Sequence, residues 1–268
     1  GLLSWLLGSI FRYRLNVVTK NLETAFPHWS KATLVRERTK FYRHLTTNTL
    51  EILATEQLND DELRQRVTFD NAELLADVSD NFQTSIIVLT LHQGNWEWLL
   101  QRAALEYPIP LVPVYKKLHN PAADQFMLGL RSLRNAQPVE MRGVAKNFIR
   151  NRRKPRIVAM LADQSPGHRE RAHRTTFLHQ DTAFYSGAAQ LARATGFPVV
   201  FADCAPISQG RYHCTLTEIT REPKRMNEGA ITEQYARLTE QAIQRSPHSW
   251  LWTNRRWKLA PLATLPTN

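Results

Sequence analysis

Residues 85–97 read Ser-Ile-Ile-Val-Leu-Thr-Leu-His-Gln-Gly-Asn-Trp-Glu, and this stretch decides the fold. Its aliphatic and β-branched beginning predicts a strand that is buried on both faces. Similar runs follow at 110–115, 156–162 and 198–205, and helical patterns lie between them at 96–106, 121–133, 144–153 and 187–195. Strands that alternate with helices at this spacing form βαβ units. We therefore expect an α/β fold with a mixed, mostly parallel central sheet covered by helices.

The rest of the chain fits around this core. It has 268 residues, 43% hydrophobic and 22% charged, which is enough apolar sequence to bury a core. Residues 30–56 predict a helix with Ser30 as its N-cap, and its other face carries Arg36, Arg38, Lys40 and Arg43. Residues 212–219 alternate weakly, which indicates an antiparallel edge strand. We expect one continuous domain, with a helical membrane-interface flank at 1–57 and the α/β core at 58–268.

The N-terminal segment predicts contact with a membrane. Residues 1–11 are mostly apolar and are followed at once by Arg12, Tyr13 and Arg14. A helix of this length, at about 1.5 Å per residue, crosses only about half of a bilayer core. Its apolar residues, which cover nearly all sides, suit a helix that lies in a membrane interface: Leu2, Leu3, Trp5, Leu6 and Leu7. The alternative is an ordinary packed helix at the start of the domain.

Charge and composition exclude several classes of protein. The net charge of +11 points to an anionic partner, which is nucleic acid, acidic membrane or acidic protein. Two cysteines, Cys204 and Cys214, exclude a disulfide scaffold and a zinc site built on paired CxxC steps. The positions of the 10 glycines exclude a GxGxxG dinucleotide loop, a GxSxG nucleophile elbow and a Gly-Lys-Ser/Thr phosphate loop.

The end of the first core strand carries the sharpest chemical signal. His92 lies where active sites of open α/β sheets form, beyond the carboxyl end of a strand. We expect Glu97 to reach back to the imidazole and raise its basicity, as a general base requires. Gly94 permits a tight turn, Asn95 caps the following helix, and free amides there would stabilise an oxyanion. The motif holds no nucleophilic Ser or Cys, so the attacking hydroxyl would come from the substrate. The alternative is a purely structural histidine.

The motif His92-Gln-Gly-Asn-Trp-Glu97 resembles the HX4(D/E) motif of glycerolipid acyltransferases. Its particular form resembles the late (secondary) acyltransferases of lipid A biosynthesis and the related bacterial lysophospholipid acyltransferases. Further segments resemble this family in the same order, namely 13–27, Val114-Tyr115-Lys116 with Asn120-Pro121, Ala162-Asp163-Gln164, 177–196 and 247–258. The chain departs from the family pattern at several positions. Among them, Lys116 stands where arginine is usual and Asn254 where histidine is usual.

This resemblance implies a glycerolipid-acyltransferase-like fold and transfer of a fatty acyl chain from a thioester to a hydroxyl of a lipid A precursor. It implies that His92 deprotonates the acceptor, that Glu97 orients the imidazole, and that attack is direct within a ternary complex. The substrate-binding residues that it implies are Lys116, Asn120, Arg131, Arg134, Asp163 and Gln164. The cations would hold phosphate oxygens. The alternatives are a solvated helix face for the two arginines and a helix cap or buried ion pair for Asp163.

The implied donor is an acyl carrier protein thioester, with coenzyme A as the alternative, and the acceptor is an anionic membrane lipid. Another acceptor that fits the family is a different glycolipid or lysophospholipid, such as a mannosylated phosphatidylinositol. We expect no cofactor, no metal and no nucleic acid. The enzyme would work at the cytoplasmic face of the bacterial inner membrane, peripherally or through an N-terminal anchor. Two basic clusters would dock either substrate or form plain solvated surface: Arg150, Arg152, Arg153, Lys154 and Arg156, and the loop with Arg169, Arg171, His173 and Arg174.

Two rival functions belong to other classes. A nucleic-acid-binding protein fits the charge and the Trp residues near basic side chains, but the chain carries no helix-turn-helix, RRM or zinc-finger pattern. A metallohydrolase would need His92, Glu97 and Asp163 to converge on a metal, and the chain carries no HExxH or HxH motif.

Overall fold

The computed structural model describes residues 4, 8, 10, 12–151, 153–167, 172–227 and 229–259. Its strands are β1 (Val67–Phe69), β2 (Ile86–Thr90), β3 (Leu111–Tyr115), β4 (Val139–Glu140), β5 (Ile157–Leu161), β6 (Ala172–Phe177), β7 (Gln180–Tyr185), β8 (Val199–Ser208) and β9 (Arg211–Thr220). Its longer helices are α2 (Leu15–Ala25), α3 (Lys31–Leu53), α4 (Asp60–Arg66), α5 (Leu74–Val78), α6 (Trp96–Glu106), α7 (Pro121–Arg131), α8 (Val144–Arg150), α9 (Gly187–Thr195) and α10 (Ala230–Arg245).

The central sheet confirms the predicted α/β fold. Its order is β1-β9-β8-β2-β5-β3-β4, and only the β8–β9 pair is antiparallel. The antiparallel pairing predicted for residues 212–219 is confirmed. Their edge position is wrong, because β1 pairs in parallel with residues 212–214 of β9 and lies outside it in the sheet. A separate two-stranded hairpin, β6–β7, lies outside the sheet and was not predicted from the sequence.

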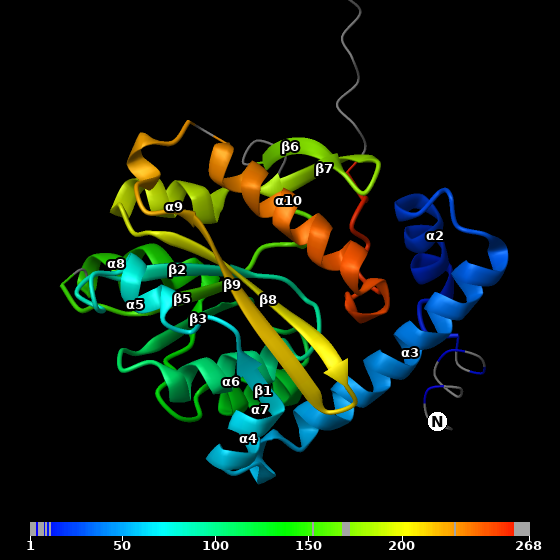
Figure 1. Ribbon diagram of the computed structural model, residues 1–268, viewed down its shortest axis with the longest axis horizontal. Helices are drawn as coiled ribbons and strands as arrows, with labels where there is room; N and C mark the ends of the chain where they lie inside the picture. Colours follow the sequence, from blue (N-terminus) through cyan, green and yellow to red (C-terminus); the bar gives the residue numbers. More distant parts are fainter. Residues whose placement is uncertain are drawn as a thin grey trace, which may run out of the picture.

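Alternate residues of the core strands enter two hydrophobic cores, one on each face of the sheet. On β2, Ile87 and Leu89 join the core shared with α2, α3, α8, α9 and α10. Ile86 and Val88 join the core shared with α4, α5 and α6. This arrangement explains why the run has no polar alternation, since neither face of the strand meets solvent. Figure 1 shows the two helical layers on either side of the sheet.

The N-terminal helices pack on the α/β core. Val18 and Leu22 of α2 and Phe41 of α3 are buried in the first core. Ser30 caps α3 as predicted, because its hydroxyl accepts from the backbone N–H of Thr33. The division at residue 57 stays a prediction.

The predicted interface helix at 1–11 lies largely outside the described residues, which include only 4, 8 and 10 of that segment. Within the described part of the chain, no helix combines the length and the apolar character that crossing a bilayer requires.

The parallel strands β2, β3, β5 and β8 place their carboxyl ends along one edge of the sheet. Helix α3 runs past this edge, at the right of Figure 1. The side chains of Asn95, after β2, and Glu51, on α3, are hydrogen-bonded at 3.1 Å, so the helix is tied to the loop that carries His92.

Candidate active site

His92 and Asp163 form a hydrogen-bonded pair at the carboxyl edge of the sheet. The imidazole Nδ1 lies 2.6 Å from the Asp163 Oδ1, and the backbone N–H of His92 donates to Oδ2 at 2.9 Å. Asp163 is only 1% exposed, whereas the imidazole side chain retains 16%. The carboxylate is therefore enclosed by protein while the imidazole remains accessible from one side.

The sheet register produces this pair. β2 and β5 are parallel neighbours in which Thr90 is opposite Leu161. His92 and Asp163 each follow their strand by the same two residues, so the register carries them to the same level. Two chain segments far apart in sequence thus meet at one point of the edge, as the rule for open α/β sheets predicts.

The carboxylate of Asp163 is held ionised. Burial alone would raise the pKa of Asp163, but the charge and hydrogen bonds of His92 and the indole N–H of Trp250 hold it below its usual value. The Trp250 Nε1 donates to Oδ2 at 2.7 Å. Trp250 lies in the 247–258 segment, which from the sequence was matched only as a family fragment, without a role for this residue.

The pairing fixes the tautomer of His92. In the neutral imidazole, Nδ1 carries the proton because it faces an ionised carboxylate, and Nε2 then keeps a free lone pair. Gln164 places its Nε2 at 3.2 Å from this nitrogen, where the amide N–H donates to it. The ring of Trp96 meets the imidazole edge-to-face at 5.2 Å between centroids. The imidazole therefore presents a base toward Gln164 and the exterior.

The carboxylate partner expected for His92 from the sequence is wrong, because Glu97 does not hydrogen-bond the imidazole. Its two oxygens accept from the Nε of Arg131 at 3.1 and 3.0 Å, and the Nη2 of Arg131 also donates to Oε1. Trp96 Nε1 donates to the same Oε1 at 3.2 Å. Because α6 begins at Trp96, the first helical turn directs Glu97 toward the end of α7 rather than back along β2.

Glu97 and Arg131 form a buried ion pair, with side chains 5% and 17% exposed. Removing one member leaves an unpaired charge, so Arg131→Met should lower the free energy of unfolding by about 3 kcal/mol or more. Urea denaturation measures the change. The matched control Arg225→Met breaks an exposed pair with Glu222 and should cost less than about 1 kcal/mol. Equally small losses of unfolding free energy in Arg131→Met and Arg225→Met would contradict a buried pair. The double variant Glu97→Leu/Arg131→Met removes both charges, so it should recover part of the unfolding free energy that Arg131→Met loses.

Gly94 occupies the turn predicted for it from the sequence. Its φ is +60°, and a Cβ at this position would lie 2.2 Å from the carbonyl oxygen of Cys204. Its N–H already donates to the Ser249 carbonyl at 3.2 Å. That bond removes the Gly94 amide from the free donors expected to stabilise an oxyanion.

Asn95 caps α6 as predicted, since its Oδ1 accepts from the Trp98 N–H at 3.0 Å. Its amide also donates to Glu51, which the sequence pattern did not single out. Glu51 accepts a 2.6 Å bond from the hydroxyl of Tyr212, and burial raises the pKa of Glu51. Nothing in the sequence pattern marks Glu51 or Tyr212. Helix α3 and strand β9 meet the turn at residues 92–95, here called the catalytic turn of the candidate site, only in the folded chain.

The predicted substrate-binding residues differ in how free they are. Lys116 is exposed and has no hydrogen-bond or ion-pair partner within the described ranges. Asn120 is also exposed, and its Oδ1 caps α7 by accepting from the Ala123 N–H at 3.1 Å. Arg134 is occupied, since it donates to Asp60 at 3.0 Å and to Gln101 at 3.2 Å. Lys116 therefore retains all of its donors for a ligand.

The first basic cluster is only partly available for docking. Arg156 is 5% exposed and donates to Asn147 at 2.8 Å and to the carbonyl of Asn151, so it stabilises the end of α8 and offers nothing to a partner. Arg150, Arg153 and Lys154 are exposed. They precede β5, whereas Asp163 follows it, which places them at the opposite edge of the sheet. Arg152 lies outside the described residues.

The two described residues of the second basic run do not form the loop expected from the sequence. His173 and Arg174 belong to β6. They pair with Glu233 at 2.9 Å and Asp181 at 2.7 Å. Arg169 and Arg171 lie outside the described residues.

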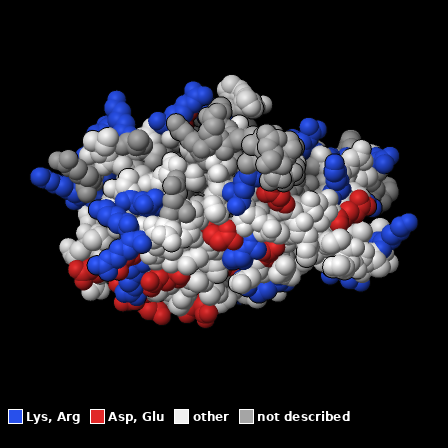
Figure 2. Space-filling model, turned by 90° about the horizontal axis from the view of Figure 1, so that it is seen from above, with Lys and Arg blue, Asp and Glu red and all other residues white. Residues whose placement is uncertain are grey.

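Seen from above, acidic side chains gather at the lower left, while Lys and Arg also occupy the upper rim and the right-hand end (Figure 2).

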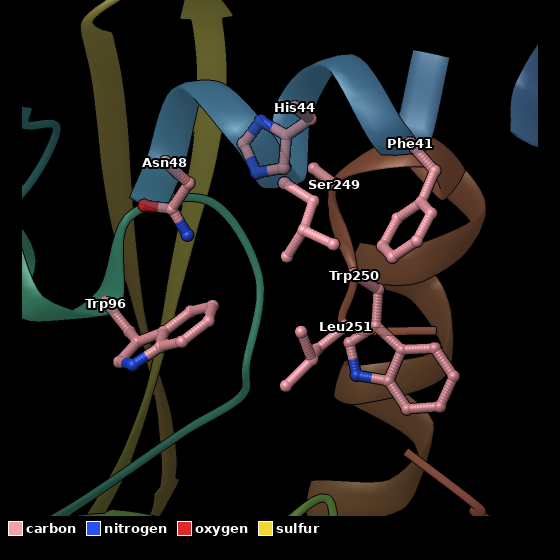
Figure 3. A pocket seen from close by; sticks show the side chains of 8 residues that line it. Phe41, His44, Asn48, Trp96, Ser249, Trp250 and Leu251 are labelled. Carbon is pink, nitrogen blue, oxygen red and sulfur yellow. The ribbon is translucent and has the colours of Figure 1, made fainter. Parts of the chain in front are cut away.

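A small cavity of about 10 Å³ lies between α3 and the catalytic turn. Figure 3 shows that side chains of α3 and of residues 249–251 line it opposite Trp96. Among the described residues, the buried Nε2 of His44 and Oδ1 of Asn48 have no hydrogen-bond partner. Burial, followed by the charge of His248, lowers the pKa of His44 to about 4.

This pKa predicts an acid-sensitive contact next to the active site. In the unfolded chain His44 has its ordinary pKa of 6.5, whereas in the folded chain its pKa is about 4. Between these pH values the unfolded state binds a proton at His44 and the folded state does not. Stability is therefore lost as the pH falls through this window. Between pH 6.5 and 4, His44→Gln should lose less unfolding free energy than the parent, by up to about 3 kcal/mol. Urea titrations at each pH measure it, and the exposed-site control His119→Gln should follow the parent.

Comparison with known proteins identifies the family of the chain. A family model described as bacterial lipid A biosynthesis acyltransferase matches residues 2–259. No curated protein matches the chain.

Proposed function

Because the chain belongs to the bacterial lipid A biosynthesis acyltransferase family and is an acyltransferase, we propose that it acylates a hydroxyl of a lipid A precursor with His92 as general base. The observation that carries this proposal is the bond of 2.6 Å between His92 Nδ1 and the buried carboxylate of Asp163. In the neutral imidazole this bond leaves the lone pair of Nε2 at the open side of the site, which is the form a general base needs.

In the proposed reaction, the acceptor hydroxyl gives its proton to His92 Nε2 as its oxygen attacks the carbonyl carbon of the acyl thioester. A tetrahedral intermediate forms and then collapses as the carbon–sulfur bond breaks. The departing thiolate takes the proton back from the imidazolium, so the enzyme returns to its starting state. Asp163 stabilises the imidazolium throughout and remains ionised. No covalent acyl-enzyme is needed, since attack comes directly from the acceptor.

Gln164 and Lys116 take substrate roles in this proposal. The amide of Gln164, which donates to His92 Nε2 at 3.2 Å, must give way to the acceptor hydroxyl and then lies beside the reacting oxygen. Lys116 follows β3, the strand next to β5, and carries a free ammonium for a phosphate oxygen of the acceptor. Glu97 and Arg131 act on this site as a rigid pair beneath Trp96, whose ring contacts His92.

The proposed donor is acyl carrier protein, with the reaction at the cytoplasmic face of the inner membrane. The family supports an acyl donor and a lipid acceptor. The net charge of +11 favours an acidic carrier and an anionic lipid.

Mass spectrometry of lipid products tests the proposal. The purified enzyme receives a lipid A precursor together with acyl carrier protein thioester or coenzyme A thioester in parallel reactions. We expect one added ester-linked acyl chain, formed faster from the carrier-protein thioester. Acylation of a lysophospholipid or phosphatidylinositol mannoside in place of the lipid A precursor would reject the proposed acceptor, and no acyl product at all would reject the reaction.

A further inference from the structure

The solvent-facing side of α3 carries cationic and aliphatic side chains that remain exposed in the folded chain. Its exposed residues, here called the outer face of α3, are Lys31, Ala32, Val35, Arg36, Thr39, Lys40, Arg43, Thr49, Leu50 and Leu53. None of them is acidic. The two acidic residues of the helix, Glu37 and Glu51, turn inward, and Glu37 is 7% exposed. The helix thus presents cations and aliphatic side chains outward without a compensating carboxylate among them.

Three large aliphatic side chains are prominent on this face. Val35, Leu50 and Leu53 are 51%, 50% and 55% exposed. Val35 and Leu53 are five helical turns apart and so lie on the same side, separated by about 27 Å along the axis. Leu50 lies about 60° around the helix from them. These three side chains, here called the apolar row, thus lie at both ends of the helix: Val35 near its start, and Leu50 and Leu53 at its end. The exposed residues between them are polar or charged.

The cations flank this apolar row. Lys31 and Arg43 have no hydrogen-bond or ion-pair partner in the part of the chain that the structure describes. Arg36 and Lys40 share the carboxylate of Glu37, at 3.2 and 2.9 Å. A helix with an aliphatic row and flanking Lys and Arg is typical of segments that lie on anionic membrane surfaces.

The opposite side of the same helix lies at the active site. Phe41, His44 and Asn48 line the small cavity opposite Trp96 (Figure 3). The ring of Trp96 in turn contacts His92. The thickness of one helix, about 10 Å, therefore separates the outer face of α3 from the catalytic turn. A surface bound to this face would lie beside the carboxyl edge where His92 works.

We propose that the outer face of α3 docks on an anionic lipid bilayer and thereby presents the carboxyl edge of the sheet to the membrane. Charge complementarity and the length of the apolar row favour a flat lipid surface over the compact contact that a carrier protein would make. This inference rests on one part of the proposed function, namely that the acceptor is a membrane lipid. It assigns the orientation of the enzyme to α3, independently of the segment at 1–11.

Vesicle co-sedimentation of the full chain tests the docking face. The vesicles contain phosphatidylcholine alone or mixed with an equal amount of phosphatidylglycerol. At low salt, Lys31→Gln/Arg43→Gln should weaken binding to the mixed vesicles about 30-fold, since each cation contributes about 1 kcal/mol near an anionic surface. Leu50→Gln/Leu53→Gln should weaken it about tenfold on both kinds of vesicle, because it removes apolar insertion.

The matched control changes a cation and an aliphatic residue on a helix whose end lies at the far edge of the sheet. Lys146 and Ile149 of α8 are exposed, Ile149 at 72%, so Lys146→Gln/Ile149→Gln should bind like the parent within about twofold. Unchanged thermal melting in all three variants shows that their folds are intact.

Parent-like vesicle binding by both α3 variants would overturn the proposal. It would also be overturned if those variants bound vesicles normally but lost transfer from acyl carrier protein thioester, because the face would then take the carrier. Transfer to a detergent-dispersed acceptor separates this inference from the proposed function. A parent enzyme that binds vesicles through α3 but transfers no acyl chain in detergent would reject the reaction and keep the docking face.

Discussion

Replacing His92 with alanine is expected to lower kcat for acyl transfer by about 10²- to 10⁴-fold, the usual contribution of a general base. The substitution removes the nitrogen that we propose accepts the hydroxyl proton. The other described side chain that hydrogen-bonds Asp163 is Trp250, whose indole N–H only donates and cannot act as a base. Steady-state kinetics with the carrier-protein thioester and a saturating lipid acceptor measure the loss.

The melting temperature separates chemistry from folding in this variant. The imidazole is partly exposed at the edge of the sheet, so its removal should change stability little beside the loss of rate. Gln93→Ala is an instructive contrast, since Gln93 is 1% exposed and donates to the carbonyl of Ala242 at 3.2 Å. Compared with His92→Ala, the Gln93→Ala variant should lower the melting temperature more and kcat less. Turnover near the parent value in His92→Ala would remove the histidine from the mechanism.

Asp163→Asn is expected to lower kcat by a similar factor, about 10³-fold, although it changes a single atom. Two donors, the His92 backbone N–H and the Trp250 indole, converge on Oδ2 of Asp163. They require an oxygen there, so the introduced amide must direct its NH2 group at the imidazole Nδ1. The proton of the imidazole then moves to Nε2, and the base is lost.

Glu97→Gln is the comparison that distinguishes the two carboxylates. Asp163 hydrogen-bonds the imidazole, whereas Glu97 hydrogen-bonds Arg131. We therefore expect Glu97→Gln to affect stability more than Asp163→Asn does, and kcat less. If Glu97→Gln proved the more damaging to kcat while Asp163→Asn left it intact, the carboxylate expected from the HxxxxE spacing would be the functional one after all. Parallel kinetics and urea denaturation of both variants decide between them.

The sequence by itself determined those features that depend on neighbours along the chain. The aliphatic run at 86–89 lies in a strand buried on both faces, because no polar residue interrupts it. Ser30, Asn95 and Asn120 became helix caps, because each precedes a helical pattern with a side chain able to accept from the first turn. Gly94 adopts the positive φ that the turn after His92 requires. These are local choices, and the family match across 2–259 agrees with the order of its motifs.

Only the tertiary structure decided which side chains meet. The order of strands makes β5 the neighbour of β2, so Asp163 reaches His92 across the sheet although 71 residues separate them. Glu97, five residues from His92, is turned away because its direction is fixed by the start of α6 and by Arg131 at the end of α7. The spacing of two residues in the sequence gives their distance along one helix or strand. Their hydrogen-bond partners depend instead on the order of the strands and on the rotation of each helix about its axis. The strand order and the helix rotation are fixed only when the two hydrophobic cores pack.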